Sequence, residues 1–277
     1  MTTPPPTPYQ RFLKAFPLKT FPPTFVPPDH PPAPEKTPIL YVFPRRKQHV
    51  TSLDVECVKY QALLAFSNYH HVTRECHQSD VSPSGHLPFL VDSEGKVLAG
   101  REIVEEVLAK MGSLESKLSD VDLADLKAFS AMTDSKLKFA LLYALWYDDR
   151  NYFELIVPVY EPLYPWPLNL IIPRLQRSKN LAWMLSRKAV LRRDEILEDA
   201  RTTLSALSSR LGGQSYFFGS KASSLDAIVF AYLHIILSVL ASPAIDNELR
   251  DIVLKHDNLV AYARRIFNTY FASSPGF

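Results

Sequence analysis

Few residues of this chain have the types and spacing that chemistry requires. Cys57 and Cys76 are the only cysteines, and they do not form the C-x-x-C motif of thiol–disulfide exchange. Both lie in apolar or strand-like sequence, which predicts free buried thiols in a reducing compartment. Four histidines lack the paired spacing of zinc ligands: His70, His71, His77 and His86. We therefore expect no metal ion and no bound cofactor.

Ser223 and Asp226 have the spacing of a helix capping box, S-x-x-D. In such a box the serine hydroxyl and the carboxylate each bind an amide at the start of the helix. The sequence after the cap is apolar on nearly every side, which is typical of a buried core helix or a membrane span. Its uninterrupted apolar part is shorter than the ~20 residues of a span, and it contains His234. We expect Ser223 and Asp226 to stabilise a central buried helix and to take no part in catalysis.

The composition allows a sizeable core and argues against several classes of function. Of the 277 residues, 47% are apolar and 12% are aromatic, and the length is sufficient for two domains. The net charge of +2 is too small to indicate a nucleic-acid partner. Neither a signal peptide nor a transit peptide is recognisable, and no segment is expected to cross a membrane.

The first folded elements are predicted to start at Pro38 and to form an α/β domain over residues 38–112. Short apolar runs predict strands at 39–43, 71–76, 89–91 and 97–99, with helices over 53–68 and 101–111. Pro88 opens the third strand and is expected to be a cis-proline. The order β-α-β-loop-β-β-α predicts a thioredoxin-like arrangement.

From Asp120 onward the pattern is helical, and an all-helical domain is expected over residues 119–277. Helices are predicted at 120–147, 179–211, 247–255 and 259–271, in addition to the capped helix. Five prolines between residues 151 and 173 predict that this segment forms no regular helix. The predicted fold class is α/β plus all-α, with a thioredoxin-like N-terminal domain followed by an all-helical C-terminal domain, as in glutathione S-transferases.

The chemistry of a glutathione transferase is missing from its expected places. Such an enzyme needs a hydroxyl or thiol just after its first strand, where this chain has Pro44–Lys47, with Thr51 and Ser52 further on and Tyr41 within the strand. It also needs an acid–Ser pair at the start of the helix after its fourth strand, where Gly100–Arg101 stands. An arginine cannot accept a hydrogen bond from the substrate's ammonium group. We expect a protein without catalytic residues.

A proline-rich apolar segment followed by basic sequence is a candidate binding surface. Residues 160–173 combine three large aromatic side chains with Leu, Ile and Pro, and no acidic residue occurs from Pro162 to Arg193. One interpretation is an ordinary loop beside a solvated helix. The other is a docking surface for an acidic partner or an anionic membrane. The candidate docking residues are Tyr164, Trp166, Leu170, Ile171, Arg174, Arg177 and Lys179.

Residues 1–37 are expected to have no regular structure. Thirteen of the 23 prolines lie within residues 1–38, and phenylalanines are interspersed among them. Proline lacks an amide donor and fixes φ, so neither helix nor sheet persists. The segment predicts either a disordered tail or an extended arm that packs on this protein or on a partner.

Several runs of sequence resemble the metaxin family. They are LWYDDRNY at 145–152, YPWPLNLIIPR at 164–174 and YFFGSKASSLDAIVFAYL at 216–233, with LYVFP at 40–44 and the LPFL hairpin. The resemblance implies a non-catalytic subunit of the mitochondrial outer-membrane sorting and assembly machinery. Such a subunit docks on the cytosolic side of the barrel-forming subunit, has a second metaxin-like subunit as a partner, and helps to receive and insert β-barrel precursors.

The resemblance also bears on membrane attachment and leaves alternatives open. Some metaxins end in a membrane anchor, whereas this chain ends in SSPGF, so it resembles the anchorless branch and is expected to be peripheral.

One alternative is a cytosolic glutathione S-transferase-like enzyme, which Gly100–Arg101 argues against. Another is a soluble scaffold of the transferase fold, which fractionation with mitochondria would distinguish.

Overall fold

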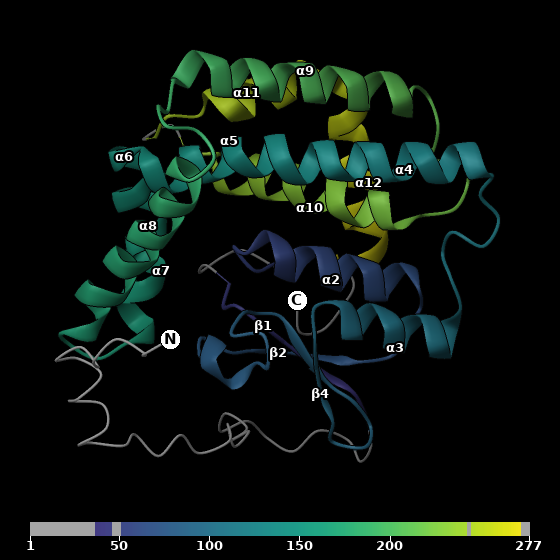
Figure 1. The fold of residues 1–277 in the computed structure, drawn as a ribbon, viewed down its shortest axis with the longest axis horizontal. Coiled ribbons are helices and arrows are strands. Elements are labelled where there is room, and N and C mark those ends of the chain that lie inside the picture. The colour runs from purple at the N-terminus through teal and green to yellow at the C-terminus, as the bar shows by residue number, and fades with distance from the viewer. Residues whose placement is uncertain (1–36, 46–50, 243–244, 273–277) are drawn as a thin grey trace, which may run out of the picture. The chain divides into compact units, whose positions relative to one another are not determined.

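The computed structural model describes residues 37–45, 51–242 and 245–272, in which an α/β part is followed by a helical part (Figure 1). These residues belong to one compact unit. The predicted arm at residues 1–37 lies outside the described residues except for its last residue. The domain boundaries at 38–112 and 119–277 stay predictions.

The α/β part is built on a four-stranded sheet with the order β2-β1-β3-β4. Its strands are β1 (Ile39–Val42), β2 (Val72–Glu75), β3 (Phe89–Val91) and β4 (Val97–Ala99). β1 pairs in parallel with β2, so a crossover is needed, and α2 (Val55–Phe66) supplies it. β3 is antiparallel to both β1 and β4, and α3 (Arg101–Met111) follows. The Leu87–Pro88 peptide bond before β3 is cis. This is the predicted thioredoxin-like arrangement.

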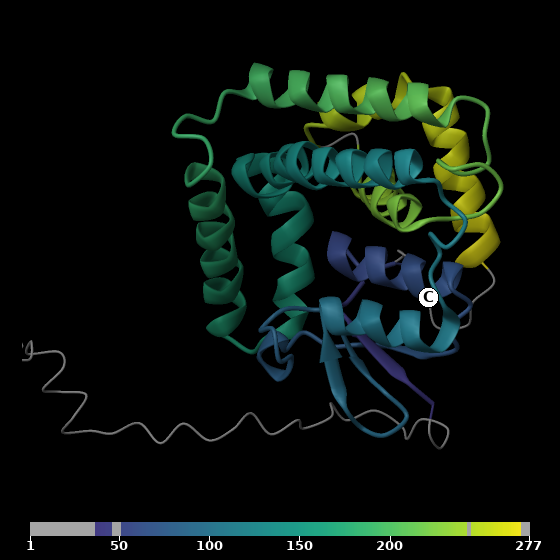
Figure 2. The same ribbon diagram turned by 45° about the vertical axis from the view of Figure 1, so that its right-hand side comes forward.

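Helix α2 lies between the sheet and the helical part (Figures 1 and 2). On one side, Cys57 and Leu64 pack into the core that covers the sheet. On the other, Val58, Ala62 and Phe66 belong to the core of the helical part. A helix with apolar residues on two faces must be covered on both. The α/β and helical parts therefore share α2 as a common wall.

The helical part contains α4 to α12 and three π-helical turns. The turns are Thr133–Leu137, Tyr143–Tyr147 and Tyr152–Ile156. The helices are α4 (Asp120–Met132), α5 (Lys138–Leu142), α6 (Asp149–Asn151), α7 (Val157–Tyr160), α8 (Leu168–Leu185), α9 (Arg193–Leu211), α10 (Ser224–Val239), α11 (Glu248–Leu254) and α12 (Asp257–Tyr270). The predicted helix at 120–147 is thus helical throughout, but its pitch changes at Thr133, Lys138 and Tyr143. At the first change the Thr133 hydroxyl donates to the Phe129 carbonyl at 2.8 Å, a bond that loosens the regular backbone pattern.

Two predictions about the segment 151–211 are wrong. Residues 151–173 were expected to avoid regular helix, but α7 lies within them and α8 starts at Leu168 with Pro173 inside it. Pro158 is the second residue of α7 and directly follows the π-helical turn Tyr152–Ile156, where the regular α-helical backbone pattern is already interrupted. The predicted helix at 179–211 is interrupted at 186–192, where the chain turns between α8 and α9.

Helix α10 is the centre of the helical core, as its sequence predicts. Its apolar residues are buried on almost every side, from Leu225 near its start to Val239 at its end. It packs against α2, α11, α12 and α4. The Asp226 side chain at its first turn is fully buried as well. The predicted helices at 247–255 and 259–271 correspond to α11 and α12, within two residues at each end.

Candidate functional site

The three hydroxyls that could stabilise a substrate thiolate are packed into the interior. Thr51 Oγ1 is hydrogen-bonded to His234 Nε2 at 2.6 Å. Ser52 Oγ accepts from the amide of Asp54 at 3.1 Å, near the start of α2. The Tyr41 ring is stacked on Phe89 in the sheet, with centroids 4.8 Å apart. Each of the three residues is at most 3% exposed. None is placed to meet a substrate at the surface.

The start of α3 offers no acid–Ser pair. Gly100 precedes the helix without a capping side chain. The Arg101 side chain is exposed and pairs with Glu105 at 2.7 Å along the helix surface. The carboxylate of Glu102, the next residue, accepts from the amide of Ala99 at 3.3 Å. This end of the helix therefore has a positive charge in solvent and no acceptor arranged for an ammonium group.

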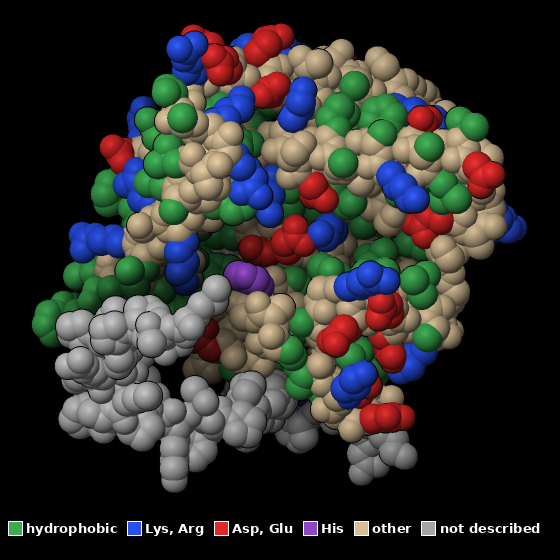
Figure 3. Space-filling model, viewed as in Figure 1, with side chains coloured by type: hydrophobic (Ala, Val, Ile, Leu, Met, Phe, Trp, Pro, Cys, Tyr) green, Lys and Arg blue, Asp and Glu red, His purple; other side chains and the backbone are tan. Residues whose placement is uncertain are grey.

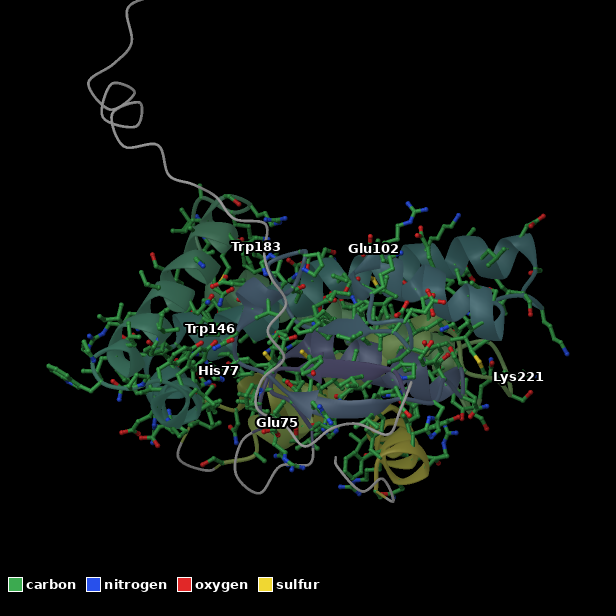
Figure 4. The ribbon with its side chains drawn as sticks, turned by 90° about the horizontal axis from the view of Figure 1, so that it is seen from below. Glu75, His77, Glu102, Trp146, Trp183 and Lys221 are labelled. Carbon is green, nitrogen blue, oxygen red and sulfur yellow. The ribbon has the colours of Figure 1, made fainter. Side chains whose placement is uncertain are left out.

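A chain of aromatic rings lies at the carboxyl ends of β1 and β2. Phe43, just after β1, contacts Tyr160 of α7, with ring centroids 5.4 Å apart. Tyr160 in turn contacts Trp146 and Tyr164. Tyr164 packs edge-on against His77, just after β2, and its hydroxyl donates to the His77 carbonyl at 3.2 Å. Figure 4 shows His77 and Trp146 at the same end of the molecule.

These rings lie at the edge of the sheet where α/β proteins commonly bind ligands. In α/β proteins the ligand crevice lies outside the carboxyl ends of parallel strands. Here Tyr160 and Tyr164 pack on that edge, and burial raises the pKa of both phenols above the ordinary value. The predicted docking residue Tyr164 is therefore a packing residue that joins the helical part to the α/β part.

Arg177, another predicted docking residue, is also occupied within the fold. Its guanidinium donates to the carbonyls of Trp146 at 2.8 Å and Tyr147 at 3.0 Å, and it pairs with Asp149. It lies over the Tyr152 ring, 4.4 Å from the centroid. These contacts tie α8 to the π-helical turns before α7. These contacts are 25 to 31 residues away in sequence, so the local pattern gave no sign of them.

The remaining predicted docking residues are exposed on α8 or just before it. Trp166 is 79% exposed, and Leu170, Ile171, Arg174 and Lys179 are exposed too. In Figure 3 hydrophobic and basic side chains gather over the α7–α8 end of the molecule. Sequence reasoning missed three exposed leucines, for which the signal was their helical spacing: Leu168, Leu175 and Leu185.

Ser223 and Asp226 form the predicted capping box at the start of α10. One Asp226 oxygen accepts from the Ser223 amide at 2.8 Å and from its hydroxyl at 2.7 Å. The other accepts from the Phe217 amide at 3.1 Å and the Tyr262 hydroxyl at 2.8 Å. Burial raises the pKa of Asp226, and these hydrogen bonds oppose the rise. The carboxylate joins α10, α12 and the loop before α10, which is a structural arrangement.

Two family models and several curated proteins match this sequence. Residues 57–177 match Tom37, described as an outer mitochondrial membrane transport complex protein, and residues 200–266 match the C-terminal domain of glutathione S-transferases. Metaxin-2 of Mus musculus is 34% identical over 239 residues, which cover 84% of this chain and 88% of that protein. Metaxin-1 of Mus musculus is 33% identical over 222 residues, covering 76% and 69%.

The chain belongs to the metaxin family. Solved structures that resemble this metaxin-family protein show its fold. A glutathione transferase of Phanerochaete chrysosporium is 15% identical with a TM-score of 0.59, covering 87% of this chain and all of that one. A β-etherase of Sphingobium is 18% identical with a TM-score of 0.57, covering 87% and 96%. The fold is glutathione S-transferase-like, as predicted.

Three further features of the described residues bear on metal binding, membrane spanning and thiol reactivity. No three His, Cys, Asp or Glu side chains among residues 37–45, 51–242 and 245–272 are grouped as metal ligands would be. Over the same ranges, every helix is too short or too polar to cross a bilayer. Cys57 and Cys76 are free and buried, and burial raises the pKa of both thiols. Raised thiol pKa values disfavour the nucleophilic thiolate.

Proposed function

We propose that this protein is a non-catalytic subunit of the mitochondrial outer-membrane sorting and assembly machinery. In this role it docks on the cytosolic side of the barrel-forming subunit, beside a second metaxin-like subunit, and helps to receive and insert β-barrel precursors. The observation that carries the proposal is the match of residues 57–177 to an outer mitochondrial membrane transport complex protein. The 34% identity to a metaxin over 84% of this chain adds to it.

The geometry supports the non-catalytic part of this proposal. Thr51 and Ser52 are hydrogen-bonded inside the protein, and Arg101 stands where a transferase has an acceptor for its substrate. Tyr160 and Tyr164 pack across the strand ends that would border the crevice. The likeness to glutathione transferases concerns the fold, and function depends on the site.

Co-purification tests the assignment to the complex. The tagged full chain is isolated from mitochondria in mild detergent, and the co-purifying subunits are identified by mass spectrometry. We expect the barrel-forming outer-membrane subunit and a second metaxin-like protein in the eluate. A protein that fractionates away from mitochondria and retains neither subunit would show that the proposal is wrong.

Two treatments of isolated mitochondria test the mode of attachment. We expect external protease to degrade the protein, because the proposed position is on the cytosolic face. Alkaline carbonate should release at least part of it, because attachment through partner surfaces is peripheral. Full resistance to carbonate combined with full protection from protease would contradict this placement.

A further inference from the structure

The outward face of α8 has a regular stripe of apolar and small side chains. Its members alternate at spacings of three and four residues, and all are exposed: Leu168, Ile171, Leu175, Ser178, Ala182 and Leu185. The leucines and the isoleucine are 42% to 52% exposed. We call these six residues the α8 seam. Alternating spacings of three and four are the heptad pattern by which one helix packs along another.

Basic residues flank the α8 seam on both sides. Arg174 directly precedes Leu175 and Lys179 directly follows Ser178, which are the flanking positions of a heptad. Both are exposed, and neither forms an ion pair with any described residue. The whole of α8 lacks acidic residues, as does the chain from residue 162 to residue 193. A partner that matches this face must therefore be acidic along the edges of its apolar stripe.

We propose that the α8 seam binds an amphipathic helix of a partner protein, whose apolar stripe is flanked by Asp or Glu. The proposal deepens the proposed function, on which it rests, by naming the chemical form of the partner's surface. Figure 2 shows α8 at the outer edge of the helical part, where a further helix can lie along it. Its 18 residues give a contact line of ~27 Å.

The form of the α8 seam favours a partner helix over a membrane surface or a second copy of this chain. A membrane-binding helix buries a broad apolar face, whereas this stripe is narrow and has Ser178 and Ala182 in its second half. Small side chains add little apolar area for lipid, but they let two helix axes approach closely. In a second copy of this chain, Arg174 and Lys179 would face basic residues of the same kind, and like charges across a helix interface are unfavourable.

The first test measures binding of a synthetic helical peptide to the purified full chain by fluorescence anisotropy. The peptide has about three heptads. Leucine occupies the two apolar positions of each heptad, and glutamate occupies the positions that flank them. We expect binding that weakens as salt rises from about 50 to about 300 mM, because the flanking charges are screened. Leu175→Ser should weaken binding roughly tenfold or more, since a buried leucine contact is lost.

Leu170→Ser is the matched control for Leu175→Ser. Leu170 is on the same helix and is 45% exposed, against 52% for Leu175, but it lies outside the seam. We expect its substitution to change peptide affinity by less than about twofold. Equal losses in the two variants would overturn the proposal, because they would show general hydrophobic adhesion. Melting curves of both variants should match the unmodified protein, since both side chains are at the surface.

Charge exchange is the second test. The double variant Arg174→Glu/Lys179→Glu should lose the glutamate-flanked peptide and gain affinity for a lysine-flanked peptide of otherwise identical sequence. Indifference to this exchange would overturn the proposal. So would seam-dependent binding to anionic phospholipid vesicles without preference between the peptides, which would show a lipid surface. Self-association abolished by Leu175→Ser would show a second copy of the chain as the occupant.

Failure of this inference and failure of the proposed function are distinguishable. If the unmodified protein co-purifies with the outer-membrane subunits but binds neither peptide, the function stands and the seam proposal is wrong. If it binds the glutamate-flanked peptide with the expected selectivity but co-purifies with no mitochondrial subunit, the seam stands and the function is wrong.

Discussion

Arg174 and Arg177 are three residues apart on α8, yet they have opposite environments. Arg174 points to solvent, while Arg177 donates to the carbonyls of Trp146 and Tyr147 and covers the Tyr152 ring. A sequence pattern assigns both to one basic surface, because it shows charge but not the distant carbonyls that fix one of them. Within a single helical turn, Arg174 is therefore available to a partner, whereas Arg177 is used in folding.

We expect Arg177→Ala to lower the free energy of unfolding by roughly 2–4 kcal/mol. The change leaves two carbonyls without their charged donor, and hydrogen bonds to charged groups contribute ~1.5–3 kcal/mol each, with partial replacement by water. Arg174→Ala on the same helix is the matched control and should stay within ~0.5 kcal/mol. Urea unfolding followed by circular dichroism measures both. Equal effects would mean that the Arg177 contacts contribute nothing.

Asp226 should matter more to stability than Ser223. Ser223→Ala removes a cap hydroxyl and is expected to cost ~0.5–2 kcal/mol. Asp226→Ala leaves the buried amides of Ser223 and Phe217 and the Ser223 hydroxyl without their carboxylate acceptor, at ~1–3 kcal/mol for each group that finds no substitute. Ser220→Ala, in the exposed loop before the cap, is the control. Loss of function in either variant with an unchanged melting curve would contradict the structural role.

At the scale of elements, the sequence predicted most of the fold because its signals were local. The strands are recognisable as short apolar runs, and α10 is recognisable from a capping box followed by apolar sequence. The start of α8 was missed because five prolines suggested an irregular segment, whereas most of them lie at helix starts and in turns, with Pro173 inside α8. The break at 186–192 has no proline or glycine, so no local signal in the sequence marked it.

The contact between α2 and α10 is the element-scale feature that a single substitution can test. Ala62 is fully buried in the helical core, and protein interiors are close-packed. We expect Ala62→Leu to destabilise the fold by roughly 1–3 kcal/mol through overpacking. Ala65→Leu on the same helix is the control, because Ala65 is only half-buried. Thermal unfolding compares the two, and a neutral Ala62→Leu would show that the shared wall is loosely packed.

For the molecule as a whole, the proposed function gives a glutathione S-transferase-like fold a non-catalytic role. The sequence predicts a protein without catalytic residues because Gly100–Arg101 stands in place of an acid–Ser pair, and this stays a prediction. It could not predict that Tyr160 and Tyr164 lie across the strand ends, because those rings come from a segment more than 80 residues beyond the strands they cover. Under the proposed function the protein acts through outer surfaces, of which the α8 seam is one.

We expect no measurable glutathione binding and no conjugation activity. Three physical reasons combine: the hydroxyls of Tyr41, Thr51 and Ser52 lie in residues that are at most 3% exposed, Arg101 offers no acceptor, and aromatic rings pack along the strand ends where the substrate would lie. Titration calorimetry with glutathione at millimolar concentration should show only heat of dilution, with an active glutathione transferase as the positive control. A Kd below about 1 mM, which corresponds to a binding free energy of roughly 4 kcal/mol, would contradict the prediction.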